Sequence, residues 1–376
     1  MKIVVAPDSF KGSLEAFEIC DIVENTAKNI FENCEVLKMP IADGGEGTVK
    51  SLISALNAKE QICNTHDPLG RMIESVYGIF GNCAIMEMAQ ASGLPLVKEN
   101  ERDILKHSTY GTGEMLNDAI QKGCKKIYMG IGGSATNDGG IGFAAAIGAV
   151  FYDKNKNKLE PIPENFMKIQ EIDVSQIDLK DTEIIVMCDV SNPLLGEKGA
   201  TYIFGKQKGA KGETLEILEK GMTHYIEIVE KTVSKEIKTQ SGAGAAGGLG
   251  AALLAYTNAT LKSGVETVLE VLDFKNKIQG ADLVITGEGM MDYQSAYGKV
   301  AYGVGKICKE QNIACTAIVG SMGKDACAMY NHGINSIVPT VNGVMTLDNA
   351  LENVVELCQS AAYRLLSLVK IGMNIK

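Results

Sequence analysis

Four glycine-rich segments of this chain carry carboxylates or hydroxyls beside their glycines, and most of them follow a short apolar run. They read IADGGEG from Ile41, GIGGSATNDGG from Gly130, SGAGAAGGLG from Ser241 and ITGEGMMD from Ile285. Glycine is usual where a backbone turns sharply or comes close to a ligand. Carboxylates in such loops can hold Mg²⁺, and backbone N–H groups there can bind phosphate. The pattern predicts a site for a phosphorylated ligand and a metal, with phosphoryl transfer as the first hypothesis.

The segment from Gly130 to Gly140 gives the strongest of these signals. It follows the apolar run IYMG and precedes a small-residue helix, so its N–H groups and the helix dipole would face an anion. The residues expected to bind substrate or phosphate here are Gly132, Gly133, Ser134, Thr136, Asn137 and Asp138. The alternative is a capping loop in which Asn137 or Asp138 caps the next helix. One cap residue would suffice for that, so the long polar run favours function.

The segment Gly242–Gly247 matches the GxGxxG fingerprint of dinucleotide-binding folds. The preceding KTQS is no strand, so the match is weak. Gly242 and Gly244 are candidates for phosphate contact. A loop and small-residue helix packed closely on a neighbour is an equally good interpretation. No GxxxxGK[ST] motif is present, which excludes a P-loop enzyme.

The carboxylates expected to hold the metal follow predicted strands; they are Asp43, Glu46, Glu288 and Asp292. In open α/β sheets ligands bind at the carboxyl ends of strands, at the point where strand order reverses. If the strand order is 2-1-3-4-5, the segment PDSFKG meets Gly287–Gly289 at that point. Its members Asp8, Ser9 and Lys11 would then join the carboxylates, with Lys299 nearby. A divalent metal and lysine would offset the mutual repulsion, and phosphoryl transfer needs that combination.

Asp189 and Asn192 follow an apparently buried strand in the segment CDVSNPLLG. An aspartate before a turn often forms only an Asx-turn. Asp189 is nevertheless our candidate for accepting or orienting the proton of an attacking hydroxyl, with Lys11 and Asp8 as further catalytic candidates and Asn192 as a binding residue. The basic run Lys206–Lys211 is plausible for phosphate, but a solvated loop is the favoured interpretation. The four histidines share no motif, and none is expected to be catalytic.

Elements that position these residues alternate at both ends of the chain. Strands are predicted at 2–6, 35–40, 282–286, 315–320 and 336–340, with helices at 13–31, 48–56, 298–311, 326–331 and 347–370. Such βα units form a doubly wound parallel sheet. The middle reads as a mixed insertion with a hairpin at 75–89, strands at 126–129 and 183–188, and helices at 113–122, 213–238, 247–256 and 265–274; residues 152–181 read as a surface excursion. We expect an α/β domain of 1–58 plus 281–376, interrupted by an insert of 59–280, with ligand loops collected in a cleft between them.

Composition limits the partners of this chain. The 376 residues carry a net charge of −10 and no tryptophan, which argues against nucleic acid and anionic membranes. Ten cysteines form no CxxC pair, a pattern typical of buried thiols in a reducing compartment. No stretch approaches the ~18–20 apolar residues of a membrane span. We expect a cytoplasmic protein, with a homodimer as one possible assembly.

The motifs together resemble the bacterial type I glycerate kinases over essentially the whole chain. The matching segments are APDSFKGS, PIADGGEGT, EMAQASGL, STYGTGE, GIGGSATNDGG, CDVSNPLLG, GAGAAGGLG and GEG followed by Asp292, Gln294 and Gly298-Lys299. The resemblance implies phosphorylation of D-glycerate with ATP and Mg²⁺, giving 2-phosphoglycerate, or 3-phosphoglycerate as the alternative. It also implies a flavodoxin-like domain interrupted by an insert that looks like the restriction-endonuclease fold.

Two positions depart from the pattern of that family. Met290 stands where the family usually has arginine, and Ala301 where it usually has proline. Loss of an arginine beside a phosphate removes a bidentate donor. Another cation (Lys299, Lys11 or Arg71) would have to compensate, or activity would be reduced or redirected. Met290 thus leaves open a metabolite-binding regulator that is descended from a kinase. The GAGAAG match leaves open a second alternative, a dinucleotide-dependent oxidoreductase.

Overall fold

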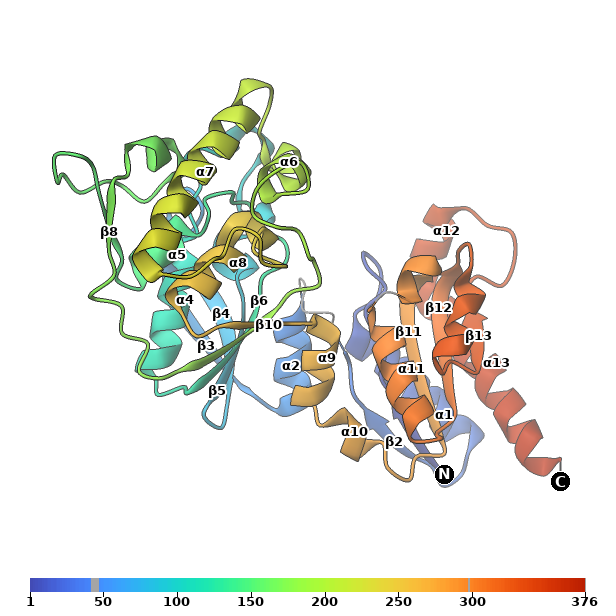
Figure 1. Cartoon of the computed structure of the whole chain (residues 1–376). Helices are drawn as coiled ribbons and strands as arrows, with labels where there is room; N and C mark the ends of the chain where they lie inside the picture. Colours follow the sequence, from blue (N-terminus) through green and yellow to red (C-terminus); the bar gives the residue numbers. More distant parts are fainter. Residues whose placement is uncertain (42–46, 297, 376) are drawn as a thin grey trace. The chain divides into compact units, whose positions relative to one another are not determined.

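The computed structural model describes residues 1–41, 47–296 and 298–375, which form two compact units. The first unit comprises Met1–Asp43, Lys50–Asn57 and Val265–Lys376, and the second comprises Gly44–Val49 and Ala58–Gly264. Asp43 and Glu46, two of the predicted metal ligands, lie outside the described residues. In Figure 1 the first unit is coloured blue and orange to red, and the second runs from light blue to yellow.

The first unit contains a parallel sheet of order β13-β12-β11-β1-β2. Numbered along this unit alone, that order is 2-1-3-4-5, as the sequence analysis supposed. Its strands are β1 (Lys2–Val5), β2 (Glu35–Lys38), β11 (Leu283–Met291), β12 (Cys315–Met322) and β13 (Ser336–Pro339). The central strands are almost continuously apolar because helices cover both faces of such a sheet.

Helices of the first unit pack on both faces of its sheet (Figure 1). They are α1 (Ala16–Ile30), α2 (Thr48–Leu56), α9 (Gly264–Val271), α10 (Phe274–Lys277), α11 (Val300–Glu310), α12 (Leu347–Glu352) and α13 (Val354–Asn374), with 3₁₀ turns η5 (Tyr293–Ala296) and η6 (Ala326–His332). One core joins Ile3, Val5 and Ile285 to apolar faces of α1 and α13. Each such buried aliphatic side chain contributes about 1.5–3 kcal/mol, and the core anchors the strands whose ends carry the candidate site.

The second unit contains a mixed sheet of order β10-β9-β6-β5-β4-β3. The strands are β3 (Lys59–His66), β4 (Met72–Phe80), β5 (Cys83–Glu87), β6 (Lys126–Gly130), β9 (Glu183–Met187) and β10 (Thr260–Lys262). The predicted hairpin is the antiparallel pair β4–β5, whereas β5, β6, β9 and β10 run parallel. The parallel strands therefore end at one edge, where the loops after Glu87, Gly130 and Met187 begin.

Helices of the second unit are α3 (Ala89–Ser92), α4 (Tyr110–Gln121), α5 (Ile141–Ala146), α6 (Ala200–Phe204), α7 (Glu213–Val233) and α8 (Ala245–Tyr256). Between them lie the 3₁₀ turns η1 (Leu94–Leu96), η2 (Glu99–Glu101), η3 (Pro163–Lys168) and η4 (Lys206–Lys208), and the antiparallel pair β7 (Val150–Tyr152) and β8 (Glu171–Asp173). The interpretation of 152–181 as a surface excursion needs correction. Phe166 is buried and its ring stacks on Tyr225 of α7 at a centroid distance of 5.0 Å, so this segment covers part of the core.

Two further expectations differ from the structure. The sequence analysis placed 265–280 in the insert, but α9 and α10 group with the first unit. Gly303 of α11 explains this, because a Cβ there would lie only 2.5 Å from Val265 Cγ1, and Lys2 Nζ donates to the carbonyls of Lys277 and Gln279. Strands β3 and β10 were also missed. Across the described part of the chain, no helix is both long and apolar enough to cross a bilayer.

Candidate active site

The carboxyl edge of the sheet in the first unit brings two sequence motifs together. The N–H of Asp8 donates to the carbonyl of Gly287 at 2.9 Å, so the PDSFKG segment continues alongside β11 beyond the end of β1. Gly289 faces that segment closely, because a Cβ there would lie 3.4 Å from Phe10 Cα and 3.5 Å from Lys11 N. The predicted meeting of these motifs at the switch point is therefore present.

Glu288 lies on a strand and not in a loop, which corrects the sequence analysis. Strand β11 runs to Met291 and pairs Glu288 with Val319 of β12. The side chain is only 5% exposed. Its Oε2 accepts a hydrogen bond from Lys299 Nζ at 3.1 Å, whereas Oε1 is buried without a partner among the described residues. Burial raises the pKa of Glu288, whereas Ser295 and Lys299 act to lower it and Asp292 adds only a small rise.

Asp292 is fixed close to Glu288 by a tight turn after β11. Its Oδ1 accepts from Gln294 N at 2.9 Å, and its own N–H donates to Ser295 Oγ at 3.1 Å. Gly323 leaves room for this turn, because a Cβ there would lie 2.9 Å from Asp292 Cβ. Glu288 and Asp292 are thus both buried and influence one another electrostatically, and Lys299 is paired with Glu288; we call the two carboxylates the acidic pair.

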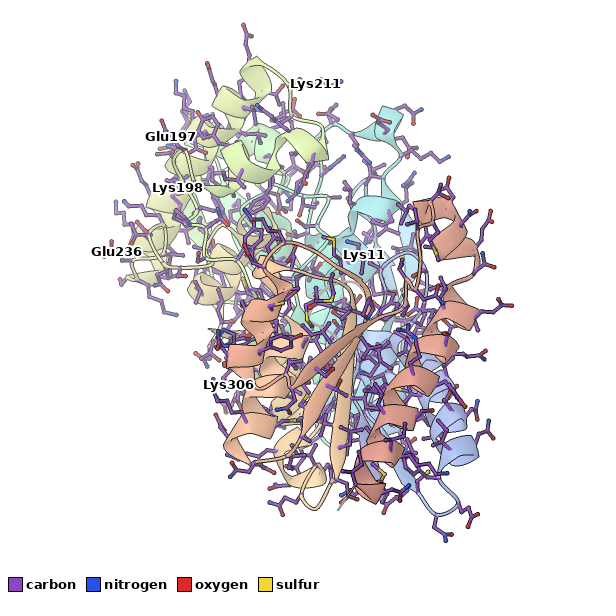
Figure 2. The ribbon with its side chains drawn as sticks, turned by 90° about the vertical axis from the view of Figure 1, so that its right-hand side faces the viewer. Lys11, Glu197, Lys198, Lys211, Glu236 and Lys306 are labelled. Carbon is purple, nitrogen blue, oxygen red and sulfur yellow. The ribbon has the colours of Figure 1, made fainter. Side chains whose placement is uncertain are left out.

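The other residues predicted for this edge have less specific surroundings. Asp8 Oδ1 accepts from Ser9 N at 2.7 Å in a local turn, and Lys11, labelled in Figure 2, is exposed. No three His, Cys, Asp or Glu side chains within 1–41, 47–296 and 298–375 gather closely enough to hold a metal ion. Of the predicted carboxylate cluster, the described residues therefore supply the pair Glu288 and Asp292.

In the second unit, the loop after β6 exposes only its tip. Gly132 and Gly133 are exposed, and Gly133 has a φ of +74° that disfavours a side chain. The segment after β5 runs alongside, since Leu94 N donates to Gly133 O and Ala135 N donates to Ser92 O, both at 2.9 Å. The tip is thus held from one side with its glycines facing solvent, as an anion-binding loop requires.

The polar residues that follow the tip are directed into the protein. Asp138 is fully buried and accepts from Thr109 N and Oγ1, Gly140 N and Gly142 N at 2.7–3.2 Å. Burial raises its pKa, and these donors oppose the rise. Asn137 Nδ2 donates to Thr201 Oγ1 at 3.1 Å, and Thr136 is also fully buried. The capping alternative thus describes Asp138. Gly132 and Gly133 remain as the ligand-facing residues of this loop, whereas Ser134 is buried behind them.

The GAGAAGGLG segment packs against the buried part of that loop. Gly139 N donates to Gly247 O at 2.9 Å, and a Cβ on Gly247 would lie 2.0 Å from Thr136 O. The N–H of Gly244 donates to Asn192 O at 3.0 Å, and a Cβ on the buried Gly242 would lie 2.5 Å from Leu261 Cδ2. These glycines serve close packing, which was the alternative to phosphate contact, and no strand leads into them as a dinucleotide fingerprint requires.

Asp189 follows β9 at the same edge of the sheet, and its side chain is exposed. Its Oδ1 accepts from Gly264 N at 3.0 Å, at the first residue of α9. Asn192 closes the next turn by donating from Nδ2 to Lys198 O at 2.8 Å. Asp189 therefore combines a helix-capping contact with access to solvent, whereas Asn192 has a structural role.

Sequence reasoning missed one functional candidate, Lys208. The run Lys206–Lys211 was interpreted as solvated, and its ends are exposed, as Figure 2 shows for Lys211. Lys208 is 2% exposed, and its Nζ donates to Ser134 Oγ and to Thr136 O, each at 2.6 Å. The nearby signal in the sequence is Gly205 and Gly209, which permit the compact turn that directs Lys208 inward.

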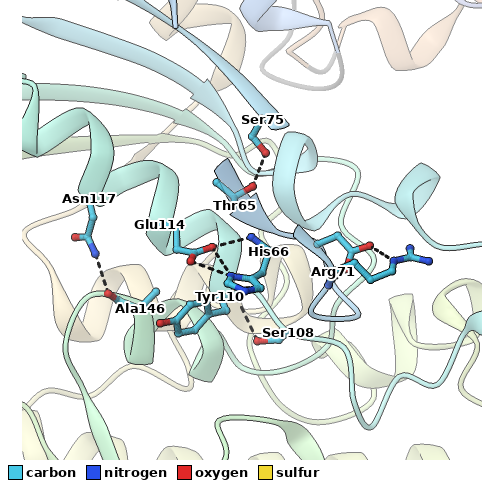
Figure 3. A network of polar contacts seen from close by, with 10 residues as sticks. Thr65, His66, Arg71, Ser75, Ser108, Tyr110, Glu114, Asn117 and Ala146 are labelled. Atoms are coloured by element: carbon cyan, nitrogen blue, oxygen red, sulfur yellow. Dashed lines mark hydrogen bonds and ion pairs between the residues drawn. The ribbon is translucent and has the colours of Figure 1, made fainter. Parts of the chain in front are cut away.

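A polar network supports the start of α4, which in turn supports the loop (Figure 3). His66 Nδ1 contacts Glu114 Oε1 at 2.9 Å, and His66 N donates to Glu114 Oε2 at 2.7 Å. The preceding Thr65 shares a hydrogen bond of 2.7 Å with Ser75. Thr109 precedes α4 and donates hydrogen bonds to Asp138. The network therefore supports the loop indirectly, through α4 and Thr109.

A lysine-paired carboxylate on one sheet and a glycine loop after a parallel strand of the other are features of α/β enzymes that bind phosphates. A family model described as glycerate kinase family matches residues 3–370. Glycerate kinase of Bacillus subtilis (strain 168) is 42% identical over 100% of this chain and 99% of its own length. Glycerate 2-kinase of Escherichia coli (strain K12) is 41% identical over 100% of this chain and 99% of its own length.

A solved structure agrees with these relatives. The crystal structure from Salmonella typhimurium LT2 that is assigned to glycerate kinase 2 matches with a TM-score of 0.91 and 39% identity, covering 100% of both chains. The chain belongs to the glycerate kinase family, and it is therefore a kinase that uses ATP.

Proposed function

We propose that this protein transfers the γ-phosphate of ATP to a hydroxyl of D-glycerate and releases 2-phosphoglycerate. The observation that carries the proposal is the buried Glu288 beside Lys299 in the second half of β11, in a chain that matches glycerate kinases over its full length. A lysine and acidic residues are the groups that bind the phosphates of a nucleotide and its metal ion in phosphoryl transfer.

The acidic pair fits a magnesium ion. Glu288 Oε1 is buried without a partner among the described residues, and Asp292 is close enough to raise the pKa of Glu288. Mg²⁺ is usually held by one or two carboxylates plus substrate phosphates and water. We assign Glu288 and Asp292 to this role, with Asp43 and Glu46 as further ligands predicted from the sequence. When bound, Mg²⁺ would neutralise charge on the transferring phosphate.

Other residues are assigned by their exposure and chemistry. Lys11 and Asp8 lie on the segment beside Glu288. Lys11 would neutralise phosphate charge, Asp8 would orient the reacting groups, and Ser9 would donate a hydrogen bond to a phosphate oxygen. In the second unit Gly132 and Gly133 would bind an oxyanion through their N–H groups. Asp189 is assigned to accept or orient the proton of the attacking hydroxyl.

The finer description of the protein is also a proposal. The strand order of the first unit supports a flavodoxin-like fold for that unit. For the insert, which ends at Gly264 in the structure, we propose a fold related to restriction endonucleases, on the mixed sheet of the second unit. We further propose that the protein works in the cytoplasm on D-glycerate and ATP, with a homodimer as its assembly.

The test is coupled ADP release with D-glycerate, ATP and Mg²⁺, with the product identified by phosphorus NMR. We expect turnover and a 2-phosphoglycerate signal. A 3-phosphoglycerate signal would keep the kinase and overturn the assigned hydroxyl. Binding of ATP and D-glycerate by calorimetry without ADP release would instead favour a regulator descended from a kinase.

Replacing Asp189 by asparagine tests the assigned proton acceptor. Asparagine keeps an oxygen for Gly264 N, so thermal stability should not change, but it cannot take a proton. We expect kcat to fall about 100-fold with little change in either KM, because general bases contribute about 10²–10⁴-fold. Undiminished kcat in Asp189→Asn would remove Asp189 from this role.

Met290 offers the opposite kind of test. Its side chain is 52% exposed on β11, in register with Ser321 of β12. An arginine there would donate two parallel hydrogen bonds to a phosphate. Met290→Arg is therefore expected to raise kcat/KM for ATP about fivefold. A Met290→Lys variant separates charge from fork geometry. Equal rates for all three proteins would show that position 290 does not contact phosphate.

A further inference from the structure

The structure places a buried lysine behind the exposed tip of the second unit's glycine loop. Lys208 ends η4, a short turn between α6 and α7. The turn is closed by Lys208 N and Ala210 N, which both donate to Gly205 O. Gly209 follows with a φ of +104°, a conformation that a residue with a side chain rarely adopts. The backbone therefore directs the Lys208 side chain inward.

The terminal amino group of Lys208 hydrogen-bonds to the loop at two residues, Ser134 and Thr136. It donates to Ser134 Oγ and Thr136 O at 2.6 Å each, on either side of Ala135, whose N–H is bound to Ser92 O. Ser134 directly follows Gly132 and Gly133, the exposed glycines. Any movement of the tip therefore stretches two hydrogen bonds that are made inside the protein, and leaving such buried polar groups unpaired is costly.

A lysine at this place costs folding free energy that an apolar residue would not. Burial lowers the pKa of Lys208 to about 7, although Asp138 acts to raise it. Other charged groups near the turn are Lys206 within it, Lys211 after it, and Arg102, whose Nη1 donates to Gln207 O at 3.4 Å. A buried charge is often replaceable by an apolar residue at little or no cost in stability. Packing alone therefore does not explain why a lysine is used here.

We propose that Lys208 is a positioning residue for an oxyanion that binds at Gly132–Gly133, through its hold on Ser134 and Thr136. The oxyanion is a phosphate of ATP or the carboxylate of the hydroxy acid, since backbone N–H groups bind both. The proposal rests on the proposed kinase function and adds the residue that shapes its anion loop. It predicts that losing the ammonium group weakens binding of one substrate more than it slows turnover.

The experiment compares Lys208→Met with Lys206→Met in the coupled assay. Methionine has nearly the length of lysine without its charge, and Lys206 is exposed in the same turn. We expect Lys208→Met to raise KM about tenfold for either ATP or D-glycerate, with kcat within about threefold, and Lys206→Met to match wild type. The substrate whose KM changes identifies the oxyanion. Values of KM within about twofold of wild type for both substrates would overturn the proposal.

A second variant keeps the test decisive if Lys208→Met does not fold. Ser134→Ala removes one of the two acceptors and leaves the lysine, so the same KM should rise about threefold; no change would count against the proposal. If wild type itself gives no ADP, the proposed function fails separately. Calorimetric titration of wild type and Lys208→Met with ATP and with D-glycerate then decides the matter, because equal affinities for both ligands would overturn the role of Lys208.

Discussion

Replacing Glu288 by glutamine is expected to reduce kcat about 100-fold or more while leaving the fold intact. Glutamine has the shape of glutamate but no charge, so Lys299 would lose its ion pair and a bound Mg²⁺ would lose a ligand. Raising Mg²⁺ should restore part of the activity, because removal of a metal ligand weakens metal binding before it abolishes chemistry. Coupled ADP release over a range of Mg²⁺ concentrations measures both effects.

The matched control for this variant is Glu266→Gln. Glu266 is an exposed glutamate on α9, in the same unit, and its Oε1 lies 3.5 Å from Lys306 Nζ. Exposed ion pairs contribute about 0–1 kcal/mol, so this variant should retain wild-type kcat and stability. If Glu288→Gln also retained wild-type turnover and an unchanged Mg²⁺ requirement, the buried acidic pair would not be the metal site.

The strand order of the first unit was predictable because each βα unit has its own periodicity and right-handed crossovers leave few topologies. The C-terminal end of β11 was not predictable from the sequence. Gly287 and Gly289 make GEGMM look like a loop, yet they allow close approach to β12 and to the PDSFKG segment: a Cβ on Gly287 would lie 2.1 Å from Ile318 O. Pairing with β12 then extends the strand past Glu288. Tertiary contact thus outweighed local preference.

In the second unit the sequence identified the correct loop but not the direction of its side chains. Asn137 and Asp138 are polar and adjacent to glycines, which suits a ligand as well as it suits a cap. Only the position of Thr109, 29 residues away from Asp138 in sequence, shows that Asp138 binds within the protein. Lys208 was missed for the same reason, since its acceptors are 74 and 72 residues distant.

The free energy of unfolding should depend on pH through Lys208. Burial lowers the pKa of this lysine to about 7 in the folded protein, whereas lysine in an unfolded chain titrates near 10.4. Between these values the unfolded chain binds about one more proton than the folded chain, so stability rises with pH by about 1.4 kcal/mol per unit. Below pH about 7 both forms carry the charge, and the folded protein bears the full cost of burying it.

Lys208→Met removes this titration, so the difference between wild type and variant isolates it. Thiols such as Cys20, whose pKa burial raises to about 12, contribute equally to both proteins and cancel. From urea unfolding at pH 7, 8 and 9, we expect wild-type stability minus that of Lys208→Met to increase by about 2–3 kcal/mol. The Lys206→Met curve should run parallel to wild type. Parallel curves for wild type and Lys208→Met would mean that Lys208 keeps its proton inside the fold, and that Asp138 and the loop oxygens stabilise the charge more strongly than burial opposes it.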